Sequence, residues 1–352
     1  MHRISVEKLI PKQEAESVFL VKYIAVAEAK DGKKYLNIIF TDKTGDLEGR
    51  SWNDAEEIAA MVSKGDFTKV KGKVNIFQGK KQFIVQSISV VDRNSVDLNE
   101  FIFKAPEDPE NMYKELLSIV SSLEDIYIKD LLTLILNESE IQRRLKIWQA
   151  GKSIHHAYES GLLQHILSCA KLAVQLSPIY GVNTSYVVAG AILHDLCKIY
   201  ELTSDFNVEY TEEGKLVGHL VKGGEILDRY TYKIKNFPYQ MKLHLKHILL
   251  SHHGEYEYGS PKIPQTSEAM LVHLIDLMDS KMHSFATIKR TDNNVGHWSS
   301  YIKHLDRIVY KAELPTYTEY ITEEKAIKPK KQKPVDRPLK GSMADALKGF
   351  KV

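Results

Sequence analysis

The sequence lacks the features that mark disulfide-rich or membrane proteins. It has only two cysteines in 352 residues, Cys169 and Cys197, both in apolar helical contexts. A disulfide framework is therefore not indicated, and a reducing compartment fits this composition. The longest apolar runs, such as 187–193, fall far short of the roughly 20 residues that a membrane-spanning helix needs. The first residues contain no apolar signal core, so we expect a cytoplasmic protein with no membrane partner.

The chain also has little net charge, +2 at neutral pH, but its positive charge is concentrated at one end. From Lys325 onward it has nine lysines and arginines against two aspartates. Prolines interrupt this stretch, KAIKPKKQKPVDRPLK, which cannot bury enough apolar surface to fold alone. We expect a disordered basic tail over 322–352 that adds nonspecific attraction to RNA. Its last residues, from Ser342, are either a frayed terminus or a short docking helix.

Five short strand-like segments occupy the first part of the chain. Turn signals separate them, and Asn53 can cap a helix over 54–62, between the third and fourth segments. Three strands, a helix and two further strands follow one another in the OB-fold, a five-stranded β-barrel. We therefore predict an OB-fold domain over 1–95. The predicted strands are 18–21, 35–40, 46–50, 68–74 and 83–88.

Basic and aromatic residues lie on adjoining strands of this predicted barrel. Barrels of this kind stack bases on aromatic rings and meet phosphates with lysine or arginine. The segment KKYLNIIFTDKTGDLEGRSWN resembles the nucleic-acid-binding OB domains of tRNA synthetases and DNA replication proteins. For any single ring, packing in the core or at the rim is the alternative. The nucleic-acid-binding candidates are Tyr35, Arg50, Trp52, Lys71, Lys73 and Phe77.

After a linker over 96–110, apolar residues recur at helical spacing. We therefore expect a second domain over 111–321 that is almost entirely α-helical, which makes the chain a multidomain α and β protein. The segments predicted as helices beyond residue 160 are 162–176, 186–199, 215–229, 239–251, 267–285 and 297–311.

Histidines and aspartates gather in this helical region around the adjacent pair His194-Asp195. Imidazole nitrogen and carboxylate oxygen hold divalent transition metals, and a dipeptide that supplies both suits two ions bridged by the carboxylate. Adjacent helical residues project about 100° apart, so both reach one site mainly from a helix facing the centre of a bundle. The doublet His252-His253 repeats this geometry, and His165 lies on a further helix.

The motifs that carry these residues form a family pattern. In chain order they are HHAYESGLLQH, GAILHDLCKIYEL, GKLVGH, LSHHGEYEYGSP and LIDLMDSKM. They resemble the HD-domain phosphohydrolases and, together with the OB-like segment, are similar to the YhaM-type 3′-to-5′ exoribonucleases over residues 17–312. The resemblance implies two metal positions, with Asp195 as the bridging carboxylate. The implied metal ligands are His165, His194, Asp195, His219, His252, His253 and Asp276.

Two members of this ligand set have alternatives. Asp279 competes with Asp276, because residues three apart share one face of a helix. One member of the histidine doublet, His252, faces either a metal or the substrate.

Three further residues are candidates for catalytic roles beside Asp195. Lys198 follows His194 by one turn and is expected to meet a phosphate oxygen; a surface lysine is the alternative. His155 and His156 precede the helix of His165, where a loop could bring them over the pocket as phosphate contacts or as a proton donor. The histidines without motif support are expected to be ordinary helical or surface residues: His244, His247, His273, His283, His297 and His304.

The implied function is a metal-dependent 3′-to-5′ exoribonuclease that degrades single-stranded RNA, and as a further option single-stranded DNA, to nucleoside monophosphates. Two divalent ions are expected, with manganese favoured because magnesium prefers oxygen ligands, and other transition metals or magnesium as alternatives. One rival function is a nucleotide or cyclic-dinucleotide phosphohydrolase, in which the barrel would have no obvious role. Another is a non-catalytic single-strand-binding factor. A homo-oligomer is an open option.

Overall fold

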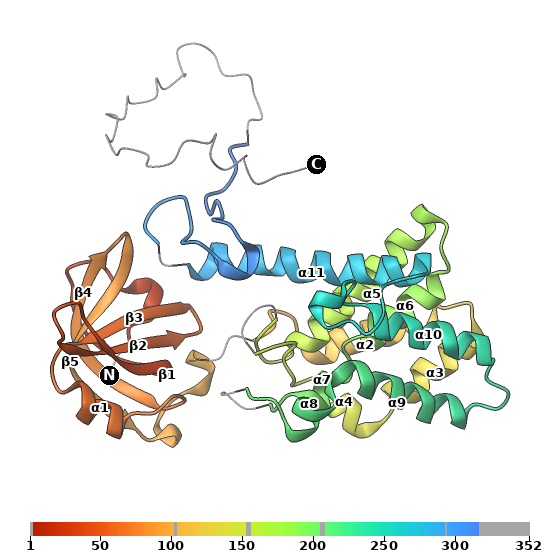
Figure 1. Cartoon of the computed structure of the whole chain (residues 1–352), viewed down its shortest axis with the longest axis horizontal. Helices are drawn as coiled ribbons and strands as arrows, with labels where there is room; N and C mark the ends of the chain where they lie inside the picture. The colour runs from red at the N-terminus through yellow and green to blue at the C-terminus, as the bar shows by residue number, and fades with distance from the viewer. Residues whose placement is uncertain (1–2, 102–103, 153–155, 205–207, 293, 317–352) are drawn as a thin grey trace, which may run out of the picture. The chain divides into compact units, whose positions relative to one another are not determined.

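The computed structural model describes residues 3–101, 104–152, 156–204, 208–292 and 294–316 (Figure 1). His155 and the predicted basic tail lie outside the described residues, and the domain boundaries stay predictions. Residues 1–312 form one compact unit. Among the helices in the described ranges, none combines the length and apolarity needed to cross a membrane.

Five strands close into a barrel with one helix between the third and the fourth (Figure 1). The strand order is β1-β2-β3-β5-β4, and the parallel pairing of β3 with β5 completes the closure. The predicted OB-fold order is therefore confirmed, although every strand is longer than predicted. The elements are β1 Glu14–Glu28, β2 Lys34–Asp42, β3 Gly45–Ser51, α1 Ala55–Met61, β4 Phe67–Phe77 and β5 Lys80–Val91.

Strict alternation of side chains sets which residues of the barrel face outward. In β2, Leu36, Ile38 and Phe40 are fully buried, so the intervening residues project outward. The ring of Phe40 occupies the space where a Cβ atom of Gly49 would lie, 2.4 Å from its Cε2 atom. Because the barrel interior is filled, only its outer surface and rim can meet a nucleic acid.

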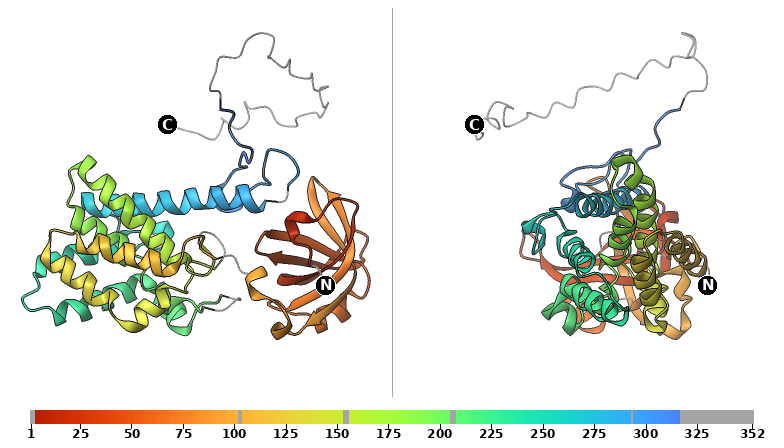
Figure 2. Two further views of the ribbon diagram at one scale, coloured as in Figure 1. Left: turned by 180° about the vertical axis from the view of Figure 1, so that it is seen from behind. Right: turned by 90° about the vertical axis from the view of Figure 1, so that its right-hand side faces the viewer.

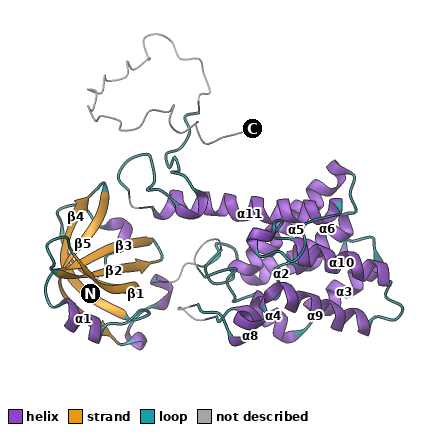
Figure 3. Cartoon of the chain, viewed as in Figure 1, coloured by secondary structure: helices purple, strands orange, loops and turns teal. Residues whose placement is uncertain are grey.

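Helices and loops make up the rest of the described chain, and no strand occurs there (Figure 3). The long helix α11 lies along α5 and also packs against α6 and α10 (Figure 2). The predicted helical domain is therefore confirmed as a fold class. Its helices are α2 Pro109–Ser121, α3 Ile126–Leu136, α4 Ser139–Leu145, α5 Gly161–Tyr180, α6 Thr184–Leu193, α7 Lys198–Glu201, α8 Glu212–Leu216, α9 Gly218–Lys233, α10 Tyr239–Ser251 and α11 Ser267–Thr291.

Helix α6 lies at the centre of this domain. Every residue from Val187 to Leu193 is buried, as expected for a helix that is apolar on all sides. At Gly190 a Cβ atom would come within 2.6 Å of Ile248 on α10 and 2.7 Å of Val272 on α11. The missing side chain lets three helices approach one another one turn before His194.

Two predicted helices are interrupted. The expected helix over 186–199 ends at Leu193, and a turn separates it from α7, so His194 caps α6 and Asp195 lies in the turn. The expected helix over 215–229 is divided at Gly218, whose φ of +76° is in the left-handed region that favours glycine. Three candidate ligands, His194, Asp195 and His219, therefore lie at helix ends, where turns orient their side chains.

The predicted helix over 297–311 is wrong. The described residues there pair as isolated bridges, Trp298 with Tyr310 and Ile302 with Arg307, around the short 3₁₀ turn Lys303–Leu305. Apolar residues recur at helical spacing in this segment, but serine and aspartate side chains bind the backbone instead. The hydroxyl of Ser299 accepts a hydrogen bond from Val309 N at 2.8 Å, for example.

The close contact at Gly190 predicts a cost for adding a single methyl group. We expect Gly190→Ala to lower the free energy of unfolding of the helical domain by about 1–3 kcal/mol, because the added Cβ overpacks the contact with α10 and α11. The matched control is Gly223→Ala on α9, where the nearest atom would lie at an ordinary 3.7 Å. There alanine's helix propensity should make the change neutral or stabilising. Urea denaturation measures both; equal effects would contradict the packing argument.

Candidate metal centre

Among the described residues, candidate ligand atoms converge in four groups inside the helical domain, three of which share His165, and two of the four contain all the predicted metal ligands. All members of a group lie within 4.8 Å of one another, and most are buried. α5, α6, α9, α10 and α11 each contribute at least one residue, counting the turns that follow them. The first group is His165, His194, Asp195 and Asp276, and the second is His219, His252 and His253.

The carboxylate of Asp195 lies between the two groups. Its Oδ2 atom is 3.4 Å from Nε2 of His165 and 3.6 Å from Nε2 of His194. Its Oδ1 atom is 3.5 Å from Nε2 of His219 and 3.8 Å from Nε2 of His252. One carboxylate therefore presents a different oxygen to each group, which is the arrangement of a bridging ligand.

Each histidine of the two groups is held through its other ring nitrogen. When Nδ1 donates to an oxygen, the Nε2 lone pair is left to bind a metal. Five histidines share this arrangement, so five Nε2 atoms are available to the centre. The Nδ1 partners are Asp279 for His165 at 2.7 Å, Ala191 O for His194 at 3.0 Å, Glu201 for His219 at 2.9 Å, Leu249 O for His252 at 2.8 Å and Tyr258 O for His253 at 3.0 Å.

Glu201 is a functional candidate that the sequence reasoning missed. Its carboxylate accepts from Nδ1 of His219 through both oxygens, at 2.9 and 3.0 Å, and from the backbone N of His219 at 3.2 Å. Burial alone would raise the pKa of Glu201, but the hydrogen bonds from His219 outweigh it and hold the pKa below its usual value. Glu201 lies one helical turn after Lys198 in the GAILHDLCKIYEL motif, and this spacing could have identified it as a neighbour of the site.

Asp276 and Asp279 occupy different positions despite sharing α11. Oδ1 of Asp276 is 3.4 Å from Nε2 of His165, on the side where the ligand atoms converge. Oδ2 of Asp279 instead meets the Nδ1 atom of His165, behind the ring, and Nε2 of His156 at 2.9 Å. Burial would raise the pKa of Asp279, but its hydrogen bonds with His156 and His165 hold it far below the usual value.

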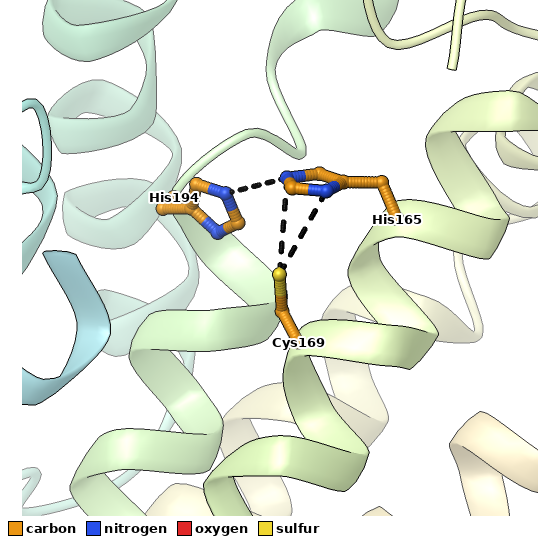
Figure 4. A group of neighbouring side chains, drawn as sticks. All are labelled: His165, Cys169 and His194. Atoms are coloured by element: carbon orange, nitrogen blue, oxygen red, sulfur yellow. Dashed lines mark hydrogen bonds between the residues drawn. The ribbon is translucent and has the colours of Figure 1, made fainter. Parts of the chain in front are cut away.

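Cys169 lies beside the first group but is poorly placed to share its metal. Its sulfur is 3.8 Å from Nδ1 and 3.9 Å from Nε2 of His165, one turn earlier on the same helix (Figure 4). Because the sulfur is equally far from both nitrogens, it packs against the ring rather than beside one lone pair. Burial raises the pKa of the thiol to about 11, which keeps it neutral. Its contact therefore limits rotation of the His165 ring.

The side chains of His156, Tyr158 and His283 form a cluster next to Asp279. The Nδ1 atom of His156 is 2.9 Å from the hydroxyl of Tyr158, which is 3.0 Å from Nε2 of His283. The rings of His156 and His283 stack with centroids 3.8 Å apart. Burial, followed by the nearby charge of His156, lowers the pKa of His283 to about 4. His283, expected to be an ordinary histidine, is thus part of the support of the centre.

Lys198 lies beside the bridging carboxylate. Its Nζ atom donates to Oδ2 of Asp195 at 2.6 Å, and its side chain is mostly buried. Burial would lower the pKa of Lys198, but the charge of Asp195 outweighs it and raises the pKa. The ammonium group therefore keeps its positive charge next to the converging ligands.

The residues fit a transition-metal site by two independent observations. Nε2 of His219 and Nε2 of His252 are buried side-chain atoms with no hydrogen-bond partner among the described residues, an arrangement that costs free energy unless a ligand binds there. Nε2 of His165 and Nε2 of His194 face each other at 3.1 Å, where two lone pairs repel unless a proton or a cation lies between them. A set rich in imidazole suits zinc, copper, iron or nickel better than magnesium, which prefers oxygen ligands.

On the barrel, the structure brings three of the six nucleic-acid candidates together. The rings of Tyr35 and Trp52 lie 4.9 Å apart, and the guanidinium carbon of Arg50 lies 4.7 Å from the Tyr35 centroid. Nε of Arg50 is buried and has no hydrogen-bond acceptor among the described residues. Trp52 is half exposed, so this trio, the barrel platform, combines an accessible ring with a positive charge.

The remaining candidates extend from the barrel platform along β4. Arg50 on β3 and Lys73 on β4 both pair with Ile84 of β5, the strand between them. Lys73 therefore lies level with Arg50, two strands across the sheet. Lys71 is two residues along the same face, opposite Ser87. Phe77 lies at the β4–β5 hairpin end, about 13 Å along the strand from Lys73 at 3.3 Å per residue.

The contacts of Glu201 predict a change in metal affinity without loss of a candidate ligand. We expect Glu201→Gln to weaken divalent-metal binding about 10- to 100-fold, because an amide orients the His219 ring less firmly and makes Nε2 less basic. Equilibrium dialysis with manganese or zinc measures this effect. Glu213→Gln on α8, whose carboxylate pairs with Lys222, is the matched control and should bind normally. Equal binding by both variants would contradict the orienting role.

Comparisons with known proteins place these features in a family. An HD domain model matches residues 162–281, and an OB-fold nucleic acid binding domain model matches residues 20–91. Among solved structures, the chain is similar to the second OB-fold domain of replication protein A from Methanococcus maripaludis, with 23% identity, 27% of this chain and 100% of that chain covered, and a TM-score of 0.23. It is also similar to Pot1pC of Schizosaccharomyces pombe, with 16% identity, 29% and 94% covered, and a TM-score of 0.25.

Among curated relatives, the 3′-5′ exoribonuclease YhaM of Geobacillus sp. (strain WCH70) is 32% identical over 274 residues, which cover 77% of this chain and 83% of the relative. The OB-fold barrel and the helical domain with its paired histidine and aspartate groups occur here in the order of the two matched domains. The chain therefore belongs to the YhaM family of 3′-5′ exoribonucleases.

Proposed function

We propose that this protein is a metal-dependent 3′-to-5′ exoribonuclease that hydrolyses single-stranded RNA to nucleoside monophosphates. The observation that supports this most directly is the convergence of two histidine groups on the two oxygens of Asp195. Hydrolysis of a phosphodiester needs a nucleophile that is active near neutral pH and positive charge beside the scissile phosphate. A divalent ion supplies both when bound, because it acidifies a water molecule and neutralises the phosphate.

Three residues at the metal centre would have separate roles in binding and positioning. Asp195 would bridge the two groups of ligands, because each of its oxygens faces one group. Lys198, already charged and 2.6 Å from Asp195, would meet a phosphate oxygen with one of its remaining N–H donors. His156, with both ring nitrogens engaged, would position Asp279 rather than donate a proton.

The OB-fold barrel would bind the single-stranded RNA. Its exposed Trp52 ring and the charge of Arg50 match what single-strand binding requires, since every base has a face to stack and every linkage carries a charge. Lys71 and Lys73 on β4 would contact phosphates of the nucleic-acid backbone. Neither stacking nor phosphate contact distinguishes ribose from deoxyribose, so single-stranded DNA would bind this surface as well.

Three further assignments belong to this proposal. Metal would occupy two positions, because two imidazole-rich groups share one carboxylate, and manganese would be the resident metal, since it accepts the carboxylates of Asp195 and Asp276 beside imidazole. The protein would work in the cytoplasm, where the two cysteines, both buried and free, would stay reduced. A homo-oligomer is compatible with this function and would be detected by light scattering.

The first test asks whether cleavage depends on the metal and on the bridging carboxylate. With 5′-labelled single-stranded RNA and manganese, we expect a ladder that shortens from the 3′ end and disappears with chelator. Asp195→Asn should lower the rate at least about 100-fold, the scale of losing one electrostatic group in an active site. Asp130→Asn, an exposed carboxylate on α3, is the matched control and should cleave normally. RNA binding without cleavage by the wild type would refute the proposal.

A second test concerns the barrel platform. We expect Trp52→Ala to weaken binding of a long single strand in chelator about 5- to 150-fold, the range for one stacked base. Phe77→Ala removes a ring of equal exposure, 52% against 51%, away from the platform and should weaken binding less. Fluorescence anisotropy measures both. Similar losses for the two variants would mean that the surface binds strands without a defined platform.

A further inference from the structure

Two exposed tyrosines follow the candidate ligand His253 in the LSHHGEYEYGSP motif. Tyr256 and Tyr258 form the ends of the short 3₁₀ turn η4 and are each 63% exposed. Within the described part of the chain, neither ring packs on another ring and neither hydroxyl makes a hydrogen bond. Each tyrosine therefore presents an aromatic face to solvent, beside the second group of ligands.

The loop that carries these tyrosines is fastened to the metal centre at two points. The carbonyl of Tyr258 accepts from Nδ1 of His253, at 3.0 Å. At its start, Gly254 has a φ of +85°, and a Cβ atom there would lie 2.2 Å from the ring of His273. Nδ1 of His273 in turn binds the carbonyl of His252, at 2.8 Å. The histidine doublet and the loop are thus held as one structure.

Hydrogen bonds inside the loop add to this fixed geometry. Ser260 donates to the carbonyl of Leu250 at the end of α10, at 3.1 Å, and its backbone N binds Glu255 O. Gly259, with a φ of +82°, closes the turn by donating to Tyr256 O at 3.0 Å. A loop constrained at both ends fixes the backbone positions of its two tyrosines, which lowers the entropic cost of binding a ligand there.

We propose that Tyr256 and Tyr258 form a stacking subsite for the base of the nucleotide at the 3′ end of the strand. This inference rests on the proposed exoribonuclease function, and it names how the centre recognises the end that it cleaves. Tyr256 is three residues from His253, so its Cα lies at most about 11 Å from the Cα of His253. A phosphodiester bound at the second group of ligands would therefore lie within reach of this loop. Because every base has an aromatic face, this contact favours a nucleotide over a bare phosphate without selecting a sequence.

The test measures whether the two rings detect a base. Two trinucleotides are compared, one intact and one whose 3′-terminal residue lacks its base, since three nucleotides are short for the barrel. For the wild type we expect the intact substrate to be favoured about fivefold or more, both in kcat/KM with manganese and in Kd with chelator. In Tyr256→Ala combined with Tyr258→Ala, both preferences should disappear, whereas hydrolysis of the abasic substrate should be unchanged.

Two controls separate stacking from folding. Tyr256→Phe combined with Tyr258→Phe keeps both rings and should keep the preference. Tyr232→Ala removes a tyrosine that is 92% exposed near the far end of α9 and should change nothing. An unchanged preference in the double alanine variant, or an equal loss on both substrates, would overturn the subsite. A wild type that leaves all RNA uncleaved would instead overturn the proposed function.

Discussion

The carboxylate of Asp195 must be buried, ionised and shared between two groups of imidazoles, and the helical domain is arranged around that requirement. Burial opposes its negative charge, but Lys198 and the surrounding histidines outweigh burial and hold the pKa of Asp195 well below its usual value. The break after α6 is part of the same arrangement. Because Asp195 lies in a turn, its two oxygens can face opposite groups, which a residue inside a continuous helix could do less easily.

Holding five imidazoles with their Nε2 atoms turned inward requires five oxygens behind them. Three are backbone carbonyls at the ends of helices or in a turn, where carbonyl groups lack helical partners. The other two are the carboxylates of Glu201 and Asp279, which add negative charge behind His219 and His165. Placing ligands at helix ends thus satisfies free backbone carbonyls and orients the ligands at the same time.

The sequence predicts the elements better than their ends. Alternating and helical periods identify the barrel and most helices, because burial of one face leaves that pattern. The pattern fails at 297–311, where serine hydroxyls compete for the backbone, and at Gly218, where one glycine divides a helix. Within the site, motifs bring the ligand candidates together, but they cannot separate Asp276 from Asp279. Only the direction of the His165 ring distinguishes them, and that depends on contacts made across the fold.

The pairing of His165 with Asp279 joins residues that are 114 positions apart in the chain. A cation held by ligands from several helices closes loops of this length, which are entropically costly to close in an unfolded chain. Such a centre is complete only when all the contributing helices are in place, and so an ion would bind the native state more tightly than the unfolded one. The supply of metal in the cell would then set how long the folded protein survives, in addition to how fast it works.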